Sequence, residues 1–311
     1  MEVTKGILAI LAASLLYGVM PVIVKELLNE GMTGECIVAW RFGTAFVICA
    51  AVAWRKKYFI RISFRQTAAA AMAGIVGFGM TASLLTVSYS YISVGLATML
   101  HFSYPLFVLL YEFFVDRKKI GGLRISAVIF MVLGLAFMIG PDSTNENIWK
   151  GTACALLSGV SYAYYVLANK RPALAQMNSL SSMFYILLFG SVFFIGKTVF
   201  RRTFTLPLSF RGWGLAVSLG FFCTVLALYF LIYGIRVLGA ANAALLNIAE
   251  PLTSVAAGAV IYQDMFDEKT VVGFILIITA IALISLSGVA NGKSRTRGNR
   301  RPDDGGDPPE D

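Results

Sequence analysis

QTAAAAMAGIVGFGMTASLLTVSYSYISVGLATMLHFSYPLFVLLY, the stretch at residues 66–111, carries no formally charged side chain over 46 residues. An unbroken helix of this length would measure about 69 Å at 1.5 Å per residue, more than twice the thickness of a bilayer's hydrocarbon core. The stretch therefore predicts two membrane-spanning helices. The break between them is expected near Ser90, Ser93 and Gly95, where small and polar residues interrupt the apolar run.

The rest of the chain has the same character. Of its 311 residues, 58% are hydrophobic and 14% are charged, whereas a soluble domain carries about 25% charged residues. A water-soluble globule is excluded, and with it a soluble enzyme or a free nucleic-acid binder. The apolar runs and their breakers predict an all-α integral membrane protein with ten transmembrane helices, at residues 5–28, 34–54, 67–90, 92–115, 122–140, 148–170, 178–199, 212–235, 238–262 and 270–289.

The distribution of Lys and Arg predicts the orientation. With the N-terminus inside, 18 of the 26 basic residues fall in cytoplasmic loops and tails and 7 fall in outer loops. This bias predicts a multi-pass protein of the cell (inner or plasma) membrane with both termini cytoplasmic. The basic loop at residues 197–211 contradicts the bias. Residues 291–311 mix charge with Gly and Pro, so we expect a disordered cytoplasmic tail in contact with water or anionic lipid.

The residue inventory does not predict catalysis or metal binding. Paired acids on one helix face, a His-Asp pair and an HExxH motif are all missing from the sequence, and it has a single histidine. We therefore expect no enzyme activity, no metal and no cofactor. The four cysteines form no CxxC pair and lie within or beside apolar runs: Cys36, Cys49, Cys154 and Cys223.

An internal repeat is visible at a nearly constant offset. A shift of 145 residues matches the first predicted helix to the sixth, and a shift of 146 matches the fourth to the ninth. Five helices per half is an odd number, so the second half (142–290) must be inverted relative to the first (1–141). Inverted repeats are typical of secondary transporters, with the substrate site near the midplane. The matched pairs include Gly6 and Gly151, Tyr17 and Tyr162, Lys25 and Lys170, Ala97 and Ala243, and Pro105 and Pro251.

Over about residues 5–290 the chain resembles the drug/metabolite transporter superfamily, in particular its EamA-type ten-helix carriers. The resemblance implies metabolite export across a bacterial inner membrane without ATP. At the end of the ninth span this family more often has Glu-Arg than the Gln-Asp found here. The residues that carry the resemblance are Ser14-Leu-Leu-Tyr17-Gly18 with Lys25, Ala39-Trp-Arg41-Phe42, Pro105-Leu106, Pro251-Leu252 and Tyr262-Gln-Asp264.

Glu250 is the strongest candidate for a functional residue. It lies about 12 residues into the ninth predicted span, roughly 18 Å from either end. An ionised carboxyl group at that depth costs several kcal/mol if it has no partner. Glu250 could hold a proton, bind a substrate amine, or do both in turn. The structural alternative is a protonated glutamate bonded to a neighbouring helix.

Two prolines at corresponding positions mark the expected wall of the cavity. Pro105 and Pro251 each free the backbone carbonyl four residues earlier, at His101 and Asn247. Freed backbone at membrane depth is tolerated where it is buried or lines a cavity. His101 could also relay a proton near neutral pH. For the two prolines, the structural alternative is a packing kink whose freed carbonyl is bonded by a nearby hydroxyl group. For His101, it is a neutral imidazole with a structural role.

Four further side chains complete the candidate substrate-binding set. Tyr104 aligns with Glu250 in the repeat, and Tyr17 aligns with Tyr162. Tyrosine walls suit an amphipathic organic solute, although ordinary helix packing accounts for any single tyrosine. Arg41, about 10 Å inside the outer end of its helix, could bind a substrate carboxylate, pair with an acid, or extend outward to the interface.

The remaining polar or glycine-rich features have structural interpretations. Glu112 lies three turns from His101, and we expect it to extend to the cytoplasmic interface. Gly74, Gly77 and Gly79 favour close helix packing over a phosphate loop, since GxxxxGK[ST] is missing.

Together these features predict a secondary transporter, an exporter of a small amphipathic metabolite such as an amino acid or amine, working by alternating access. The expected partners are the solute, protons in one alternative, and membrane lipids; no nucleic acid is expected. The rival hypotheses are a membrane scaffold or receptor and, less favoured, an intramembrane enzyme.

Overall fold

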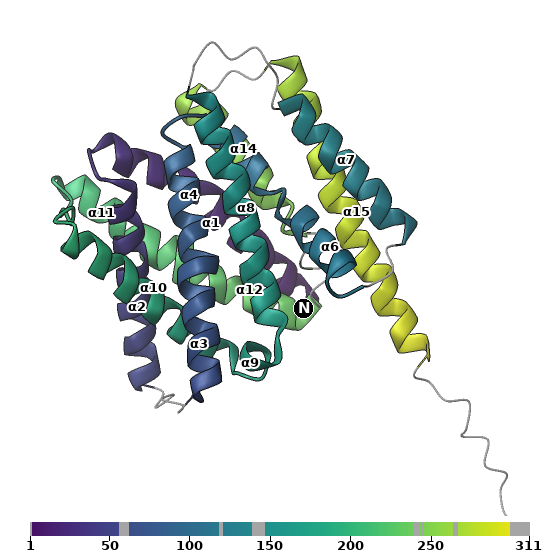
Figure 1. Ribbon diagram of the computed structural model, residues 1–311, viewed down its shortest axis with the longest axis horizontal. Helices are drawn as coiled ribbons and strands as arrows, with labels where there is room; N and C mark the ends of the chain where they lie inside the picture. Colours follow the sequence, from purple (N-terminus) through teal and green to yellow (C-terminus); the bar gives the residue numbers. More distant parts are fainter. Residues whose placement is uncertain are drawn as a thin grey trace, which may run out of the picture.

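The computed structural model describes residues 2–55, 62–117, 121–138, 147–238, 243, 246–263 and 267–298 (Figure 1). This part of the chain consists of helices, turns and short connections and contains no β-strand, as the sequence predicted. Seven of its helical stretches are long and apolar enough to cross a membrane, and the shorter Gly122–Phe137 is apolar as well. The seven are Glu2–Asn29, Gly34–Arg55, Phe64–Ser88, Val94–Phe114, Ile148–Asn169, Leu180–Phe200 and Phe210–Ile235.

The break predicted inside the charge-free stretch is confirmed. The helix before it ends at Ser88 and the next begins at Val94, where the Ser93 side chain accepts a hydrogen bond from the Leu96 backbone N–H at 3.2 Å. Such a serine cap satisfies one of the free N–H groups at a helix start. The first half contains α1 (Glu2–Asn29), α2 (Gly34–Arg55), α3 (Phe64–Met72), the π-helix η1 (Ala73–Gly79), α4 (Met80–Ser88), α5 (Val94–His101), α6 (Tyr104–Phe114) and α7 (Gly122–Met138).

The second half follows the same order. It contains α8 (Ile148–Lys170), the short α9 (Pro172–Ala175), α10 (Ser179–Phe200), α11 (Phe210–Gly220), the π-helix η2 (Phe221–Leu226), α12 (Ala227–Leu238), α14 (Ala249–Tyr262) and α15 (Glu268–Gly298). One boundary prediction is wrong: α15 continues to Gly298, whereas we expected disorder from Asn291. The first proline of that segment is Pro302, so nothing before it forces the helix to stop.

Both prolines of the repeat coincide with breaks in a helix. Phe102 and Ser103 form a turn after α5, and Pro105 lies in the first turn of α6. In the same way Asn247 and Ile248 form a turn, and Pro251 lies in the first turn of α14. A proline in the first turn of a helix displaces no intrahelical hydrogen bond. Each proline therefore stands just after a break instead of in the middle of a continuous helix.

The packing of the helices crosses between the two halves. Helix α1 packs against α12 and α14, while α8 packs against α4, α5 and α6. Helix α2 packs against α10, and α7 lies along α15 at one edge of the bundle (Figure 1). The first helix of each half thus packs mainly against helices of the other half.

Glycines permit the closest of these contacts. A Cβ atom added to Gly74 would lie 3.3 Å from Ile186 Cα, and one added to Gly77 would lie 2.9 Å from Tyr165 Cβ. The glycine run of the third span therefore serves close helix packing, as the sequence indicated.

Candidate functional site

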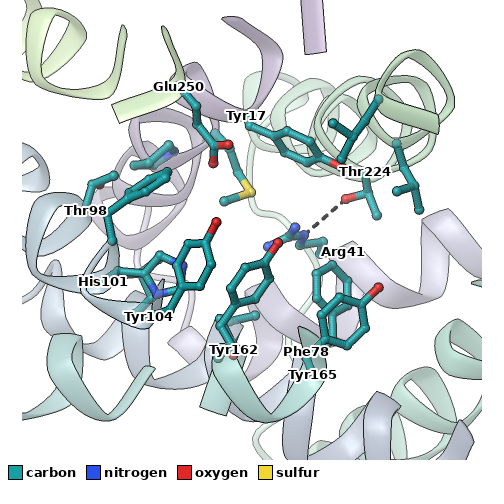
Figure 2. Close-up of a pocket in the computed structure, with 18 of the residues that line it drawn as sticks. Tyr17, Arg41, Phe78, Thr98, His101, Tyr104, Tyr162, Tyr165, Thr224 and Glu250 are labelled. Carbon is teal, nitrogen blue, oxygen red and sulfur yellow. Dashed lines mark hydrogen bonds between the residues drawn. The ribbon is translucent and has the colours of Figure 1, made fainter. Parts of the chain in front are cut away.

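A cavity of about 170 Å³ lies between the two halves (Figure 2). Side chains from α1, α2, α4, α5, α6, α8, α10, α12 and α14 and from both π-helices line it. It is smaller than the pockets that enclose drug-sized ligands, so it suits a small solute. All seven residues that the sequence singled out for substrate binding lie on its wall: Tyr17, Arg41, His101, Tyr104, Tyr162, Asn247 and Glu250.

Glu250 is held by a chain of hydrogen bonds that begins on another helix. Ser14 of α1 donates to the Asn247 side-chain oxygen at 3.0 Å, and the Asn247 amide donates to Glu250 Oε2 at 2.9 Å. Glu250 is half-buried in the first turn of α14, where the helix dipole favours a negative charge. The adjacent Pro251 is buried, and Glu250 itself lines the cavity.

His101 is held in a comparable way from the opposite half. Its ring Nδ1 lies 2.9 Å from the Ser158 hydroxyl of α8, which donates its own proton to the Ala155 carbonyl at 2.6 Å. With the serine proton directed to the Ala155 carbonyl, the contact is completed by an imidazole N–H at Nδ1, and in that neutral tautomer Nε2 would be an acceptor. Ser14 with Asn247 and Ser158 with His101 are thus two similar serine contacts, each joining one half to the other.

Tyrosines form the aromatic wall of the cavity. The rings of Tyr104 and Tyr162 meet edge to face with centroids 4.7 Å apart, and Tyr162 stacks on Tyr165 at 5.6 Å. His101 meets Tyr162 edge to face at 5.3 Å. An edge-to-face cluster of this kind is rigid and presents ring faces and hydroxyl groups to a bound solute.

Arg41 points into the cavity and does not extend outward to the interface. Its side chain is buried, with the residue 6% exposed. Its Nε donates to Thr224 Oγ1 at 3.1 Å, and its guanidinium carbon lies 5.2 Å from the centre of the Phe78 ring. Arg41 is therefore fixed by one hydrogen bond and one cation–π contact, and Figure 2 shows it in a common space with Glu250 and Tyr162.

Both partners of Arg41 come from π-helices. Phe78 belongs to η1 and Thr224 to η2, the third spans of the first and second halves. Thr224 itself donates to the carbonyl of Leu219, five residues earlier, at 3.0 Å. π-helical turns are rare and occur often at functional sites. These two turns bring a ring and a hydroxyl group, one from each half, to the same guanidinium.

Several lining residues were missed at the level of sequence. They are apolar or hydroxyl side chains whose types occur throughout a membrane protein, so no pattern singled them out. Glu112 does not line the cavity. Its carboxyl group pairs with Arg124 at 3.5 Å. The missed lining residues include Phe78, Thr81, Tyr89, Thr98, Met183 and Thr224.

Ion pairs join the helix ends that flank two loops, at the end of the bundle where α1 ends and α2 begins. Glu35 contacts Lys197 at 2.7 Å and Arg201 at 3.5 Å, and Glu26 pairs with Arg211. The basic loop that contradicted the charge bias is thus balanced by acids from the first half. Further contacts strengthen the junction, since the Trp40 indole donates to the Thr205 carbonyl at 3.1 Å.

Comparison with known proteins agrees with this architecture. The family model of the EamA-like transporter family matches twice, over residues 4–140 and 149–286. A solved crystal structure superposes with a TM-score of 0.64 over 97% of this chain and 99% of its own, at 14% sequence identity. At that level of identity the likeness concerns the fold.

Curated relatives share between 21% and 26% of their residues with this chain over the matched regions. An S-adenosylmethionine uptake transporter of Rickettsia prowazekii is 26% identical over 68% of each chain. An uncharacterized transporter of Archaeoglobus fulgidus is 25% identical over 80% of this chain and 87% of its own length. The match to an uncharacterized transporter of Clostridium kluyveri is 21% identical, and the chain spans only 56% of that relative's length.

The two family matches cover nearly all of the apolar part of the chain and agree with the sequence resemblance. The helices supply the means to cross a membrane several times. The protein is therefore a multi-pass membrane transporter and belongs to the EamA-like transporter family.

Proposed function

We propose that this protein is a secondary transporter that moves a small amphipathic metabolite, such as an amino acid or amine, by alternating access. The observation that carries the proposal is the central cavity, which combines an acid, a base and several tyrosines deep between the helices of both halves. A scaffold has no need of such a cavity. In a scaffold, the polar groups that line the cavity would lower the stability of the protein in the membrane and serve no function.

The proposal includes ten transmembrane helices in two inverted five-helix repeats. Three observations support it: the contacts of α1 mirror those of α8, the α2–α10 and α7–α15 pairs join equivalent helices, and one π-helix occurs in the third span of each half. Helices broken near the midplane, with the start of a half-helix at the site, are frequent in transporters of this plan. The starts of α6 and α14, which carry Tyr104 and Glu250, fit that pattern.

Alternating access requires one end of the cavity to close while the other opens. The ion pairs of Glu26 and Glu35 with Arg211 and Lys197 join the first half to the second, so they are suited to hold one end closed. We propose that this end is periplasmic or extracellular and that its opening accompanies export. The Rickettsia relative is named an uptake transporter, so the direction of transport must be measured directly.

The test is counterflow in proteoliposomes that contain the full-length protein. Vesicles are loaded with one unlabelled amino acid or amine, and uptake of the same labelled compound is followed against protein-free vesicles. We expect saturable exchange for at least one compound of the panel, and vesicles of known protein orientation then give the direction. Exchange no greater than in protein-free vesicles for every amino acid and amine would overturn the proposal.

A further inference from the structure

A second cavity, of about 310 Å³, lies between α2, α10, η2 and α12. It is near the end of α2 and the start of α10, whereas the ion pair of Glu35 with Lys197 joins the other ends of these two helices. Its lining residues Val52, Leu180 and Tyr229 are 43%, 41% and 59% exposed, so the cavity opens toward the surroundings of the bundle. In a membrane those surroundings are lipid, and a ligand can enter from the bilayer.

The lining of this second cavity is mainly apolar, with side chains such as Phe184, Val225 and Ile232. Apolar cavities stay dry, so water is a poor occupant. One lining residue departs from this character. Ser181 is 6% exposed, and its hydroxyl group has no hydrogen-bond partner in the described chain. A buried hydroxyl group without a partner lowers stability. The cavity therefore suits a ligand that is mainly apolar and carries a hydrogen-bond acceptor.

A positive charge lies close to the mouth of the cavity. Arg55 is the last residue of α2 and is exposed. It lies one helical turn beyond Val52, on the same face of the helix. Lys56 and Lys57 follow it in the sequence. In the proposed topology this end of α2 is cytoplasmic, and the cytoplasmic leaflet attracts basic segments through its anionic lipids.

We infer that the second cavity binds an anionic phospholipid, with an acyl chain between α2, α10 and α12, an ester carbonyl at Ser181 and the phosphate group near Arg55. The acyl chain packs against the apolar lining, and the ester carbonyl accepts a hydrogen bond from the unpartnered hydroxyl group. The guanidinium forms charge-assisted hydrogen bonds with the phosphate. A phospholipid of the adjacent leaflet supplies all three groups and reaches the site without passing through the central cavity.

The bound lipid also supports a wall of the central cavity. The π-helix η2 contributes Thr224 to the central cavity and Val225 to the second one, and Met183 lines both. Thr224 accepts the hydrogen bond from Arg41. A chain packed against Val225 therefore favours the arrangement of η2 that holds Arg41. We expect anionic phospholipid to raise the unfolding temperature and to increase counterflow; the second expectation rests on the proposed function.

Photolabelling of the full-length protein tests the site. The protein is reconstituted in phosphatidylcholine vesicles with a trace of phosphatidylglycerol that carries a diazirine in its acyl chain, and the labelled residues are mapped by mass spectrometry. Labelling should fall within residues 49–53, 180–184 and 221–233. Unlabelled phosphatidylglycerol should displace the label at least about fivefold more effectively than unlabelled phosphatidylcholine, as expected for one basic residue near an anionic headgroup.

Two pairs of variants separate the acyl chain from the headgroup. Ala53→Phe adds a ring inside the cavity and should abolish the labelling, whereas Ala51→Phe adds it to an exposed position of α2 that does not line the cavity and should keep it. Arg55→Gln should reduce the preference for phosphatidylglycerol about fivefold. Its control, Arg202→Gln, changes an exposed arginine just after the far end of α10 and should keep the preference.

The wild-type competition decides the matter even if Ala53→Phe fails to fold. Equal displacement by the two lipids would overturn the anionic site. Labelling outside the cavity segments, or equal labelling of Ala53→Phe and Ala51→Phe, would overturn the cavity as its place. An unfolding temperature that phosphatidylglycerol leaves unchanged would overturn the support of η2. Loss of counterflow in every lipid would instead contradict the proposed function and leave the lipid site intact, because photolabelling does not depend on transport.

Discussion

Glu250 combines a place on the wall of the central cavity, a position in the first turn of α14 and a hydrogen bond to a single neutral partner. Replacing it with Gln preserves size and hydrogen bonding but removes the ability to change charge. We therefore expect Glu250→Gln to fold with a thermal stability close to that of the wild type. Counterflow should fall by at least about tenfold, the loss expected when one charge-assisted bond is removed. The pH dependence of transport should also flatten.

The matched control for this variant is Glu112→Gln. Glu112 is also a carboxyl group in an apolar helix, but it contacts Arg124 and does not line the cavity. Its variant should transport like the wild type. A Glu250→Gln protein with full activity under an imposed proton gradient would remove Glu250 from the mechanism and direct attention to His101 and Arg41.

The sequence predicted much of the site because depth and repeat symmetry can be read from spacing. Glu250 stood out by its distance from both ends of its span, and Tyr104 by its alignment with Glu250. The structure brings both to one cavity. The partners of Arg41 could not be predicted, since Phe78 and Thr224 lie in π-helical turns. A π-turn changes which residues face inward, and a 3.6-residue period does not reveal it.

At the scale of helices, α1 and α14 approach closely at Gly18. A Cβ atom there would lie 2.8 Å from Thr253 Cγ2 and 2.9 Å from the Glu250 carbonyl oxygen. Overpacking of this kind costs about 1–3 kcal/mol. Gly18→Ala should therefore lower the unfolding temperature in detergent. It should also reduce transport, because α14 must move together with Glu250.

Gly196→Ala is the control for Gly18→Ala. Gly196 lies in α10, and a Cβ atom there would meet nothing within 4 Å. The alanine should leave stability and transport unchanged, or raise stability slightly through its better helix propensity. Equal losses in the two variants would show that glycine flexibility, not close packing, matters at Gly18.

The ion pairs between the loops give a second prediction at this scale. The side chains of Glu35 and Lys197 are 30% and 32% exposed, so solvent screens much of their attraction. A double-mutant cycle with Glu35→Gln and Lys197→Gln should give a coupling energy of about 0.2–1 kcal/mol in thermal or denaturant unfolding. Strictly additive effects would mean that the pair contributes nothing to closing this end.

The helices themselves were easier to predict than their interruptions. The charge-free stretch required a break, and Ser93 marks where the next helix starts. Disorder from Asn291 was a wrong prediction because composition alone does not end a helix, and α15 continues to Gly298. Among the described residues, seven stretches satisfy length and apolarity for a span, whereas the sequence predicted ten spans in the whole chain. Helices α7 and α14 have 17 and 14 residues, below the roughly 20 that a span needs.

At the scale of the whole molecule, three ion pairs help to place the basic loop at residues 197–211, which disagreed with the charge bias. Lys197, Arg201 and Arg211 contact acids at the end of α1 and the start of α2. The loop at 197–211 and the loop around residues 30–35 must therefore lie on the same side of the membrane. With the N-terminus inside, both loops are outside, as ten spans require.

Cysteine labelling tests that orientation. Leu208, in the loop between α10 and α11, is 87% exposed, and Gln176, between α9 and α10, is exposed at the other end of the bundle. In a background in which the four native cysteines are replaced and transport is retained, Leu208→Cys should react with a membrane-impermeant maleimide in intact cells. Gln176→Cys should react only after lysis, because cytoplasmic loops are inaccessible to the reagent.

The two positions together make the test decisive. Helix α10 separates them, so a single crossing of the membrane by α10 requires opposite labelling, whatever the orientation. Reaction of Gln176→Cys in intact cells, with Leu208→Cys protected until lysis, would invert the topology and place the basic cytoplasmic loops outside, against the 18-to-7 distribution of Lys and Arg. Reaction of both in intact cells would mean that α10 does not span, and the inverted five-helix repeat would fail with it.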